Sequence, residues 1–157
     1  MLLKQHIIIK YKIKYNFTEY SLYKKGLKIK KSNINGMGLF ARKYFPKNKK
    51  IIEFKGDHLT TEQMNKRYGY DVTKKTPPYA NRHTSRLNFI PPNKRYWIDP
   101  IINRFGGEYV NDGIYGQAKP YANVKIHARF ITATKLIRPD EELVMNYGNI
   151  YWEKIKN

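Results

Sequence analysis

Residues 129–152 read RFITATKLIRPDEELVMNYGNIYW, and this stretch is the most informative part of the chain. It contains two apolar segments, RFITATKLI and ELVMNY, on either side of the turn sequence RPDE. Short runs of apolar and β-branched residues bounded by proline and acidic turn residues are typical of β-strands. The stretch therefore predicts two strands, and the second of them ends in Tyr147.

The residues before this stretch predict further short strands separated by turn residues. The predicted strands are LKIKKS (27–32), LFARKYF (39–45), KIIEFKG (50–56), RLNFI (86–90), RYWID (95–99) and ANVKI (122–126). RLNFI and RYWID flank PPNK and are expected to form a hairpin. Seven or eight short strands with little helix indicate a mostly β domain.

One helix and one insert complete the expected organisation. Thr60 followed three residues later by Gln63 is a capping-box pattern, and it predicts a helix over TEQMNKRY that stops at Gly69. Residues 71–84 are rich in Lys, Thr, Pro and Asn, and we expect them to form a mobile insert.

Composition excludes several classes of site. The 157 residues suit one domain and are 41% hydrophobic, enough to bury a core. The absence of cysteine excludes disulfides, thiolate zinc sites and a cysteine nucleophile. The four histidines have no metal-ligand spacing, so we expect no metal site. The apolar start MLLKQHIII is interrupted and too short to span a membrane, which predicts an intracellular protein without a membrane partner.

The charge is strongly positive, with 31 Lys and Arg against 12 Asp and Glu and a net charge of +19. Such a charge attracts polyanions, nucleic acid first and acidic membrane second. The alternative is that an AT-rich genome inflates the lysine content. In residues 1–31, nine Lys accompany one acid, and apolar residues from Ile9 to Tyr15 alternate with lysines. This alternation predicts either a nucleic-acid arm or an edge strand protected by lysines.

Three short motifs are ambiguous by themselves but informative as an ordered set. GMGLFA (36–41) and NDG (111–113) are ordinary turns when taken alone, and the tyrosine of ELVMNYG would normally be core. In order, GMGLFARKYFPKNKKIIEFKGD, YWIDP, GGEYVND, ANVKI and the 129–152 stretch resemble the SET domain of protein lysine methyltransferases. The resemblance runs from about Leu27 to Trp152 and is strongest with the short SET proteins of large DNA viruses.

The resemblance implies a fold of several small β-sheets with a knot-like C-terminal segment and one or two short helices. It divides the chain into a basic N-terminal segment, residues 1–26, and a SET domain, residues 27–157, with the insert at about 71–84. The N-terminal segment is then an added strand or a dimer contact. Many relatives complete the lysine channel with a zinc-bound segment made of cysteines, and this chain contains no cysteine. The insert, the N-terminal segment or a second copy of the chain must replace it, so a homodimer is one expectation.

The resemblance also implies an S-adenosylmethionine-dependent lysine N-methyltransferase that acts on histone tails. The target amine must be neutral, and a free lysine with a pKa of about 10.4 pays about 4 kcal/mol for this near neutral pH. A narrow apolar channel helps because it penalises the ammonium form. The reaction requires no metal.

Cofactor-binding residues carry over position by position. The glycine-containing turn is Gly36, Met37 and Gly38, where close backbone approach requires small residues. The family's Asn-His pair is Asn111 and Asp112, and Asn123 matches a second asparagine. Two departures are Asp112 itself and Glu108, which replaces an arginine. Trp152 is expected near the adenine, with a role as a C-terminal core aromatic as the alternative.

Catalytic and channel residues follow in the same way. Tyr147 matches the catalytic tyrosine, and Asn146 replaces the acid that precedes it. Phe54 replaces a second active-site tyrosine. The predicted substrate channel consists of Phe54, Ile126, Met145 and Tyr151. Met145 replaces a Phe or Tyr that affects product state, which predicts that the pocket accepts mono- and dimethyl-lysine.

Three functions remain open from the sequence. The first is a histone methyltransferase that acts on nucleosomes, located in the host nucleus if chromatin is the substrate. The second is a non-catalytic SET-like module that binds DNA or chromatin through its Lys-rich surface. The third is a methyltransferase for a non-histone basic protein, such as a DNA-packaging protein.

Overall fold

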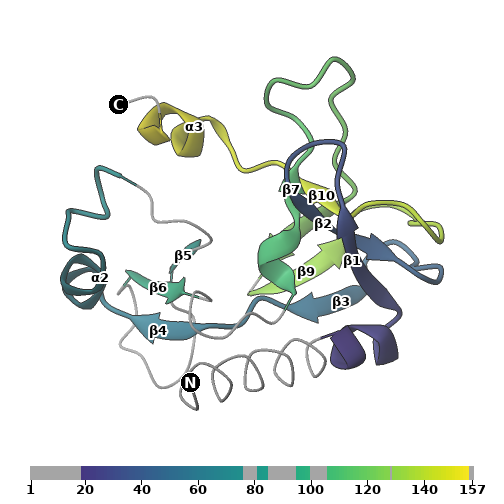
Figure 1. Ribbon diagram of the computed structural model, residues 1–157, viewed down its shortest axis with the longest axis horizontal. Coiled ribbons are helices and arrows are strands. Elements are labelled where there is room, and N and C mark those ends of the chain that lie inside the picture. Colours follow the sequence, from purple (N-terminus) through teal and green to yellow (C-terminus); the bar gives the residue numbers. More distant parts are fainter. Residues whose placement is uncertain (1–18, 76–80, 85–94, 100–105, 128, 156–157) are drawn as a thin grey trace, which may run out of the picture.

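The structure is a computed structural model, and it describes residues 19–75, 81–84, 95–99, 106–127 and 129–155 (Figure 1). Two expected strands, Ile9 to Tyr15 and RLNFI (86–90), lie outside these residues. The described part consists of four small sheets of two or three strands with short helices around them. The prediction of a mostly β domain is confirmed.

The first sheet pairs β1 (Leu27–Lys31) with β2 (Met37–Ala41) in antiparallel register, with Leu27 opposite Ala41. Both strands were predicted, but β2 ends at Ala41 instead of continuing to residue 45. Residues 19–24 form a helix before β1, and its Leu22 is buried in the main core. The basic N-terminal segment is therefore, over these residues, an integral part of the packing.

The second sheet has the order β3-β9-β8 and is antiparallel throughout. Its strands are β3 (Lys50–Glu53), β9 (Phe130–Ala133) and β8 (Val124–His127). The predicted strand 129–137 is thus only four residues long. Beyond it, Ile137 pairs with Phe45 in an isolated bridge, which ends the regular ladder.

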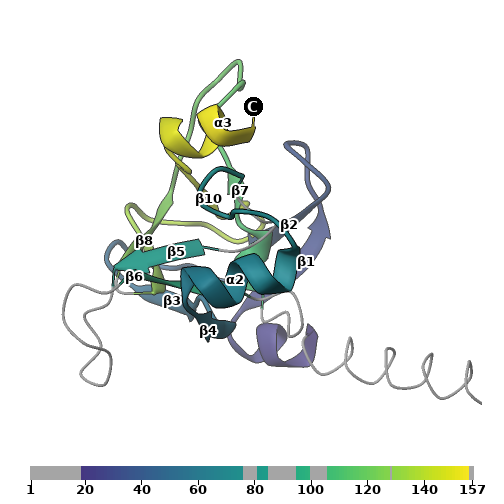
Figure 2. The same ribbon diagram turned by 90° about the vertical axis from the view of Figure 1, so that its left-hand side faces the viewer.

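The third sheet has the order β4-β6-β5, and α2 packs against it (Figure 2). Its strands are β4 (Asp57–Leu59), β6 (Arg95–Asp99) and β5 (Asn81–Thr84). Two corrections follow: β4 was not predicted, and residues 81–84, expected to belong to a mobile insert, form an edge strand. Both strands obtain their backbone partners from β6, a long-range pairing that local composition does not reveal.

Helix α2 (Thr61–Tyr68) has the predicted ends. The Thr60 hydroxyl accepts from the Gln63 amide at 3.2 Å, and the Gln63 side chain accepts from the Thr60 amide at 2.8 Å. Gly69 closes the helix in the left-handed conformation at φ 74°. The helix buries Met64 against Val72 and Trp97, which forms a small second core.

The fourth sheet is a short parallel pair, β7 (Asn111–Asp112) and β10 (Val144–Met145), preceded by the 3₁₀ helix η1 (Gly107–Tyr109). NDG, which reads as an ordinary turn when taken alone, contributes Asn111 and Asp112 to a strand. The segment at β10 runs through the middle of the molecule: Leu143 N donates to Leu39 O at 2.7 Å, while Asn123 N donates to Val144 O at 3.0 Å.

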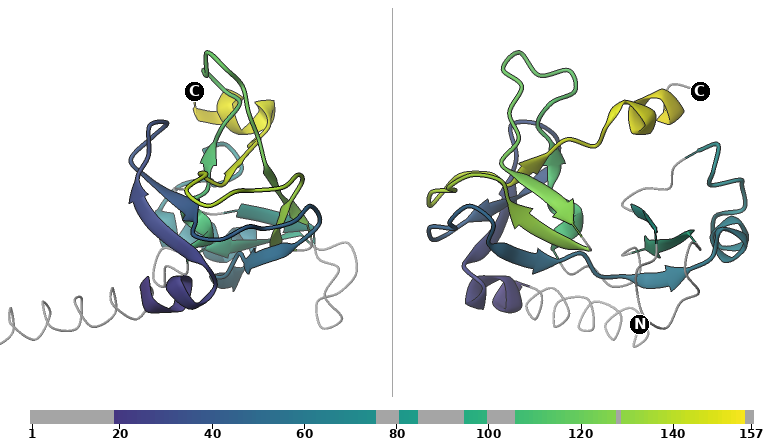
Figure 3. Two further views of the ribbon diagram at one scale, coloured as in Figure 1. Left: turned by 90° about the vertical axis from the view of Figure 1, so that its right-hand side faces the viewer. Right: turned by 180° about the vertical axis from the view of Figure 1, so that it is seen from behind.

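Helix α3 (Asn149–Ile155) follows β10 and was not predicted. It lies with the 113–121 loop at one end of the molecule, and helix 19–24 lies at the other end (Figures 1 and 3). Within the described residues, no helix is long and apolar enough to cross a membrane. The same residues contain no group of three acidic or histidine side chains placed to hold a metal ion.

Candidate active site around Tyr147

Tyr147 lies two residues beyond the end of β10, and its hydroxyl is held by the main chain. The hydroxyl donates to the Val110 carbonyl at 2.6 Å, across 37 positions of sequence. The parallel pairing of β7 and β10, with Met145 opposite Asp112, brings these two segments together. The phenol is thus fixed by a buried carbonyl at the start of the strand that carries Asn111.

The surroundings of Tyr147 keep its phenol neutral. Burial is the main cause that raises its pKa well above the usual value near 10, and Tyr151, Asp112 and Glu142 add to the effect. Burial and then Asp112 also raise the pKa of Tyr151. At physiological pH, the Tyr147 hydroxyl is therefore a hydrogen-bond donor and orienting group, and it is not a phenolate base.

Asp112 is a buried hub for the hydrogen bonds of this region. Its Oδ1 accepts from the amides of Ile114 at 2.7 Å and Tyr115 at 3.3 Å. Its Oδ2 accepts from Trp152 Nε1 at 2.6 Å and from the Tyr147 amide at 3.4 Å. The Asp112 carboxylate thus ties α3 and Tyr147 to β7.

Four aromatic rings from two segments gather around this carboxylate. Tyr115 stacks on Trp152, with ring centroids 4.4 Å apart and planes at 12°. Tyr151 meets Tyr147 edge-on at 4.9 Å and Trp152 edge-on at 5.1 Å. We call these residues and Asp112 the Tyr147 cluster. Tyr151 and Trp152 therefore lie beside Tyr147, the predicted catalytic tyrosine. Tyr115 was not predicted as a site residue, and only the folded structure shows that it lies here.

Asn111 connects the cluster to the glycine turn. Its Nδ2 donates to the carbonyls of Asn35 at 3.0 Å and Met37 at 3.2 Å, and to Glu142 Oε1 at 3.0 Å. Glu142 in turn accepts from the Ser32 hydroxyl at 2.9 Å. The sequence reasoning missed Glu142, although its position within ELVMNY, before the strand, placed an acid near the predicted site.

The two glycines of the turn are needed for different reasons. Gly36 has φ 48°, a backbone conformation that favours glycine, and a Cβ there would meet nothing within 4 Å. A Cβ on Gly38 would lie 2.2 Å from Glu142 Oε1. In the structure, the Glu142 carboxylate fills the space that a side chain at Gly38 would take. The close approach of main chain to cofactor predicted at this glycine stays a prediction.

The predicted channel residues fall into two neighbouring clusters. Met145 is buried in the main core, with Tyr147 packed against that core. Phe54 is buried with Ile98 in a smaller cluster, and Ile126 packs against both clusters. The structure thus brings Met145 and Tyr151 to Tyr147, while Phe54 is connected to them through Ile126.

The remaining matched positions have structural partners. Asn123 is fully buried: its Nδ2 donates to Glu142 O at 2.8 Å, and its Oδ1 accepts from Val144 N at 2.9 Å. Glu108 Oε2 accepts from Gly106 N at 3.0 Å. The exposed Asn146 uses its Oδ1 to accept from Gly148 N at 2.8 Å, so it shapes the turn before α3.

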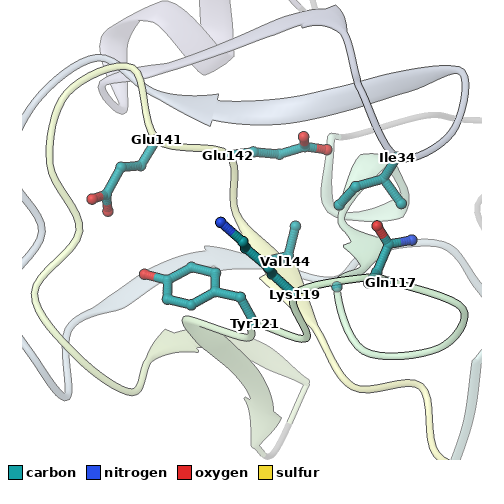
Figure 4. A pocket seen from close by; sticks show the side chains of 8 residues that line it. Ile34, Gln117, Lys119, Tyr121, Glu141, Glu142 and Val144 are labelled. Atoms are coloured by element: carbon teal, nitrogen blue, oxygen red, sulfur yellow. The ribbon is translucent and has the colours of Figure 1, made fainter.

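A pocket of about 300 Å³ lies beside the glycine turn and not at Tyr147 (Figure 4). It is bounded by the β1–β2 turn, the 113–121 loop and the segment before β10. Its lining residues are Ile34, Gly113, Gln117, Lys119, Tyr121, Glu141, Glu142 and Val144. Glu142 therefore contacts both the pocket and Asn111, but none of the predicted site residues lines the pocket.

Comparisons with known proteins agree with this geometry. The SET domain family profile matches residues 36–148, which is more than half of the chain. No curated protein matches the chain. The solved structures that share the fold include three whose alignments cover 78–83% of this chain.

The methyltransferase domain of human PR domain-containing protein 2 is 23% identical, with a TM-score of 0.55 and 84% of that chain covered. The Neurospora SET domain protein DIM-5, a histone lysine methyltransferase, is 16% identical, with a TM-score of 0.57 and 52% covered. CpSET8 from Cryptosporidium is 20% identical, with a TM-score of 0.53; the chain spans 57% of it. The family match and the shared fold together show that the chain belongs to the SET-domain family.

Proposed function

We propose that the protein is an S-adenosylmethionine-dependent lysine N-methyltransferase that acts on histone tails. One observation carries this proposal. The Tyr147 hydroxyl is neutral, is fixed by the Val110 carbonyl at 2.6 Å, and stands where β10 meets the strand of Asn111 and Asp112. A neutral phenol held in one orientation at this crossing suits the positioning of a methyl donor and an amine.

The residues present fit S-adenosylmethionine in their chemistry. Asn111 holds the carbonyls of Asn35 and Met37, and so shapes the turn whose main-chain groups would receive the methionine end. Trp152 and Tyr115, which stack on each other, bring to this region aromatic rings of the kind that packs against a purine. When bound, the cofactor supplies a methyl group on a sulfonium.

The chain's own residues contribute orientation and a water-poor wall. The Tyr147 hydroxyl orients the reacting groups, and it keeps its proton because burial raises its pKa. The apolar side chains of Phe54, Ile126 and Met145 disfavour the ammonium form of an entering lysine. The lysine loses its proton to water before transfer, because the phenol is no base. Since Met145 cannot hydrogen-bond an ordered water as a tyrosine can, we propose that mono- and dimethyl-lysine are also accepted.

The choice of a histone substrate fits the charge of the chain only in chromatin. A protein of net charge +19 repels a free basic peptide at long range. In a nucleosome, DNA offsets this repulsion, and the enzyme would then act in the nucleus. A non-histone basic protein bound to DNA would also have the repulsion offset by DNA. The relation to viral SET proteins is a separate prediction.

A non-catalytic SET-like binding module is the second candidate, and Asp112 favours it. Its carboxylate is fully engaged by Trp152, Ile114, Tyr115 and Tyr147, so this departure from the family has a structural use. In this reading, the Tyr147 cluster stabilises α3 and no methyl group is transferred.

Cofactor binding and methyl transfer separate the two candidates. We expect S-adenosylmethionine to bind in calorimetry, and labelled methyl to transfer to core histones and to nucleosomes. Tyr147→Phe should reduce transfer about 100-fold while the fold persists, in keeping with the loss of one oriented hydroxyl donor. Tyr44→Phe removes a hydroxyl from an exposed tyrosine and should leave transfer to a free histone peptide unchanged. Cofactor binding without transfer by the wild type would support the second candidate.

The product state tests the proposal for Met145 separately. End-point mass spectrometry of a histone peptide should show di- and trimethyl-lysine. A reaction that stops at one methyl group would contradict the proposed role of Met145 and leave the methyltransferase assignment intact.

A further inference from the structure

The end of the molecule opposite α3 carries an exposed surface of tyrosines and cations. Tyr44, Tyr23 and Tyr20 are 62%, 58% and 57% exposed, more than any other large apolar or aromatic side chain in the described part of the chain. They come from helix 19–24 and from the residues after β2. We call the surface formed by Tyr20, Tyr23, Lys24, Arg42, Lys43 and Tyr44 the tyrosine–cation face.

Contacts between the two segments make this a single surface. The Arg42 guanidinium lies 3.6 Å from the centre of the Tyr23 ring, and the Arg42 amide donates to Gly26 O at 2.8 Å. Lys43 lies against Gly26, where a Cβ would come within 2.6 Å of its side chain. Lys24 Nζ lies 4.6 Å from the Tyr20 ring centre.

The charge around this face is almost entirely positive. Residues 19–50 contain ten Lys and Arg and a single acid, Glu19. Asp140, whose amide donates to Ala41 O at 2.9 Å, is bonded through its side chain to Lys28. The next acid, Glu141, forms an ion pair with Arg138 at 3.8 Å. The cations of the face therefore have few carboxylates to neutralise them, and a polyanion would fit.

The arrangement of the rings distinguishes between polyanions. Each cation–π contact uses a tyrosine ring to hold a cation in place, so that the cation is presented with less loss of side-chain entropy on binding. One face of Tyr20 and one of Tyr23 are thereby covered, which leaves less ring surface for stacking unpaired bases. Cations that are already held in place suit contacts with the phosphates of a duplex. Covered tyrosine rings are less suited to stacking on the unpaired bases of a single strand. The face lacks the Trp, Phe and Leu that insert into membranes.

We propose that the tyrosine–cation face binds the phosphate backbone of double-stranded DNA without reading its sequence. Helix 19–24, which carries Tyr20, Tyr23 and Lys24, and α3, which carries Tyr151 and Trp152, lie at opposite ends of the molecule, so DNA and cofactor can be bound together (Figures 1 and 3). This inference stands without the proposed methyl transfer, because it concerns a surface that shares no residue with the site.

Binding of a fluorescent 20-base-pair duplex to the full chain, measured by anisotropy at several salt concentrations, tests the proposal. We compare the triple variant Lys24→Gln, Arg42→Gln, Lys43→Gln with the control Lys66→Gln, Lys74→Gln, Lys75→Gln. The control removes the same charge from exposed lysines of α2 and the following turn, at the other side of the molecule. The first triple should weaken binding about tenfold or more and lower the slope of log K against log salt by about 2.

The control triple Lys66→Gln, Lys74→Gln, Lys75→Gln should change the affinity for the duplex less than about threefold. Tyr23→Leu should weaken binding about threefold because it removes the ring that holds Arg42. Circular dichroism melts check that each variant folds. Equal effects of the two triples would overturn the proposal, since binding would then follow net charge alone. Tighter binding of a single-stranded 20-mer, or equal binding of polyglutamate, would also overturn it.

Discussion

In the lobe made of α2 with β4, β5 and β6, the groups that define the ends of the helix lie close together in sequence, whereas the groups that build the Tyr147 cluster lie far apart. Thr60, Gln63 and Gly69 define α2 within ten residues. The Tyr147 cluster depends on hydrogen bonds from Tyr147 to Val110 and from Trp152 to Asp112, 37 and 40 positions apart. Short-range signals can be recognised along the chain, but the site appears only when the fold is known.

The two regions also differ in how charge is used. In the α2 lobe, Arg67 bridges two acids: Nη1 donates to the buried Asp99 at 2.9 Å, and Nη2 donates to Asp57 at 2.8 Å. In the Tyr147 cluster, the buried Asp112 accepts only from neutral donors, namely three amides and an indole. The lobe is therefore held by ion pairs of Arg67. The site is held by a carboxylate whose four hydrogen-bond donors are all uncharged.

The largest effect on stability is expected from Arg67→Met. This change removes the cation that faces Asp99, whose side chain is fully buried. Loss of one partner of a buried pair costs several kcal/mol, and since Arg67 is partly exposed we expect a loss of about 3 kcal/mol in urea unfolding. Lys66→Met, on an exposed neighbour, should change stability by less than about 0.5 kcal/mol. Equal effects of the two changes would show that the Arg67 bridge does not hold the lobe.

A smaller effect, concentrated at the site, is expected from Asp112→Asn. One carboxylate oxygen becomes an NH₂ group that faces a donor, so Trp152 Nε1 or the Ile114 amide loses its acceptor, at a cost of about 2 kcal/mol. Trp152→Phe removes the same hydrogen bond from the other side. If the bond is real, the two changes together should cost clearly less than their sum. Additive losses in unfolding and in cofactor affinity would contradict the hub role of Asp112.

The smallest effect on stability is expected at the glycine turn. Gly36→Ala should cost about 1 kcal/mol through strain at positive φ. Gly38→Ala should cost a similar amount because it displaces Glu142 from Asn111. Glu142→Ala should therefore relieve part of the defect in Gly38→Ala but none of that in Gly36→Ala. Relief in both variants, or in neither, would refute the packing of Glu142 against Gly38.

The sequence predicted the elements that local chemistry defines. The capping box of α2, the strands β1, β3, β6, β8 and β9, and the family itself followed from short patterns. Strand β4, with only three residues, and β5, in polar sequence, were missed because their stability comes from pairing with β6. Helix α3 was missed because its anchor, Asp112, lies 40 residues from Trp152.

At the site, the sequence predicted which residues come together better than it predicted how they interact. Tyr147, Asn111 and Trp152 lie together as expected. The packing of the Glu142 carboxylate beside Gly38 was not predicted. Asp112 and Tyr115 acquire their roles from hydrogen bonding and stacking that residue identity alone does not specify.

The pH dependence of methyl transfer tests most directly the claim that Tyr147 orients the reaction as a neutral phenol. Burial raises its pKa above the usual value, so it keeps its proton throughout the range from about pH 7 to pH 9.5. The log of kcat/KM on a histone peptide should rise with pH as the substrate lysine loses its proton. Tyr147→Phe should lower the curve by one constant factor without changing its shape. An inflection in this range that disappears in Tyr147→Phe would show that the phenol ionises and acts as a base, and would contradict the account.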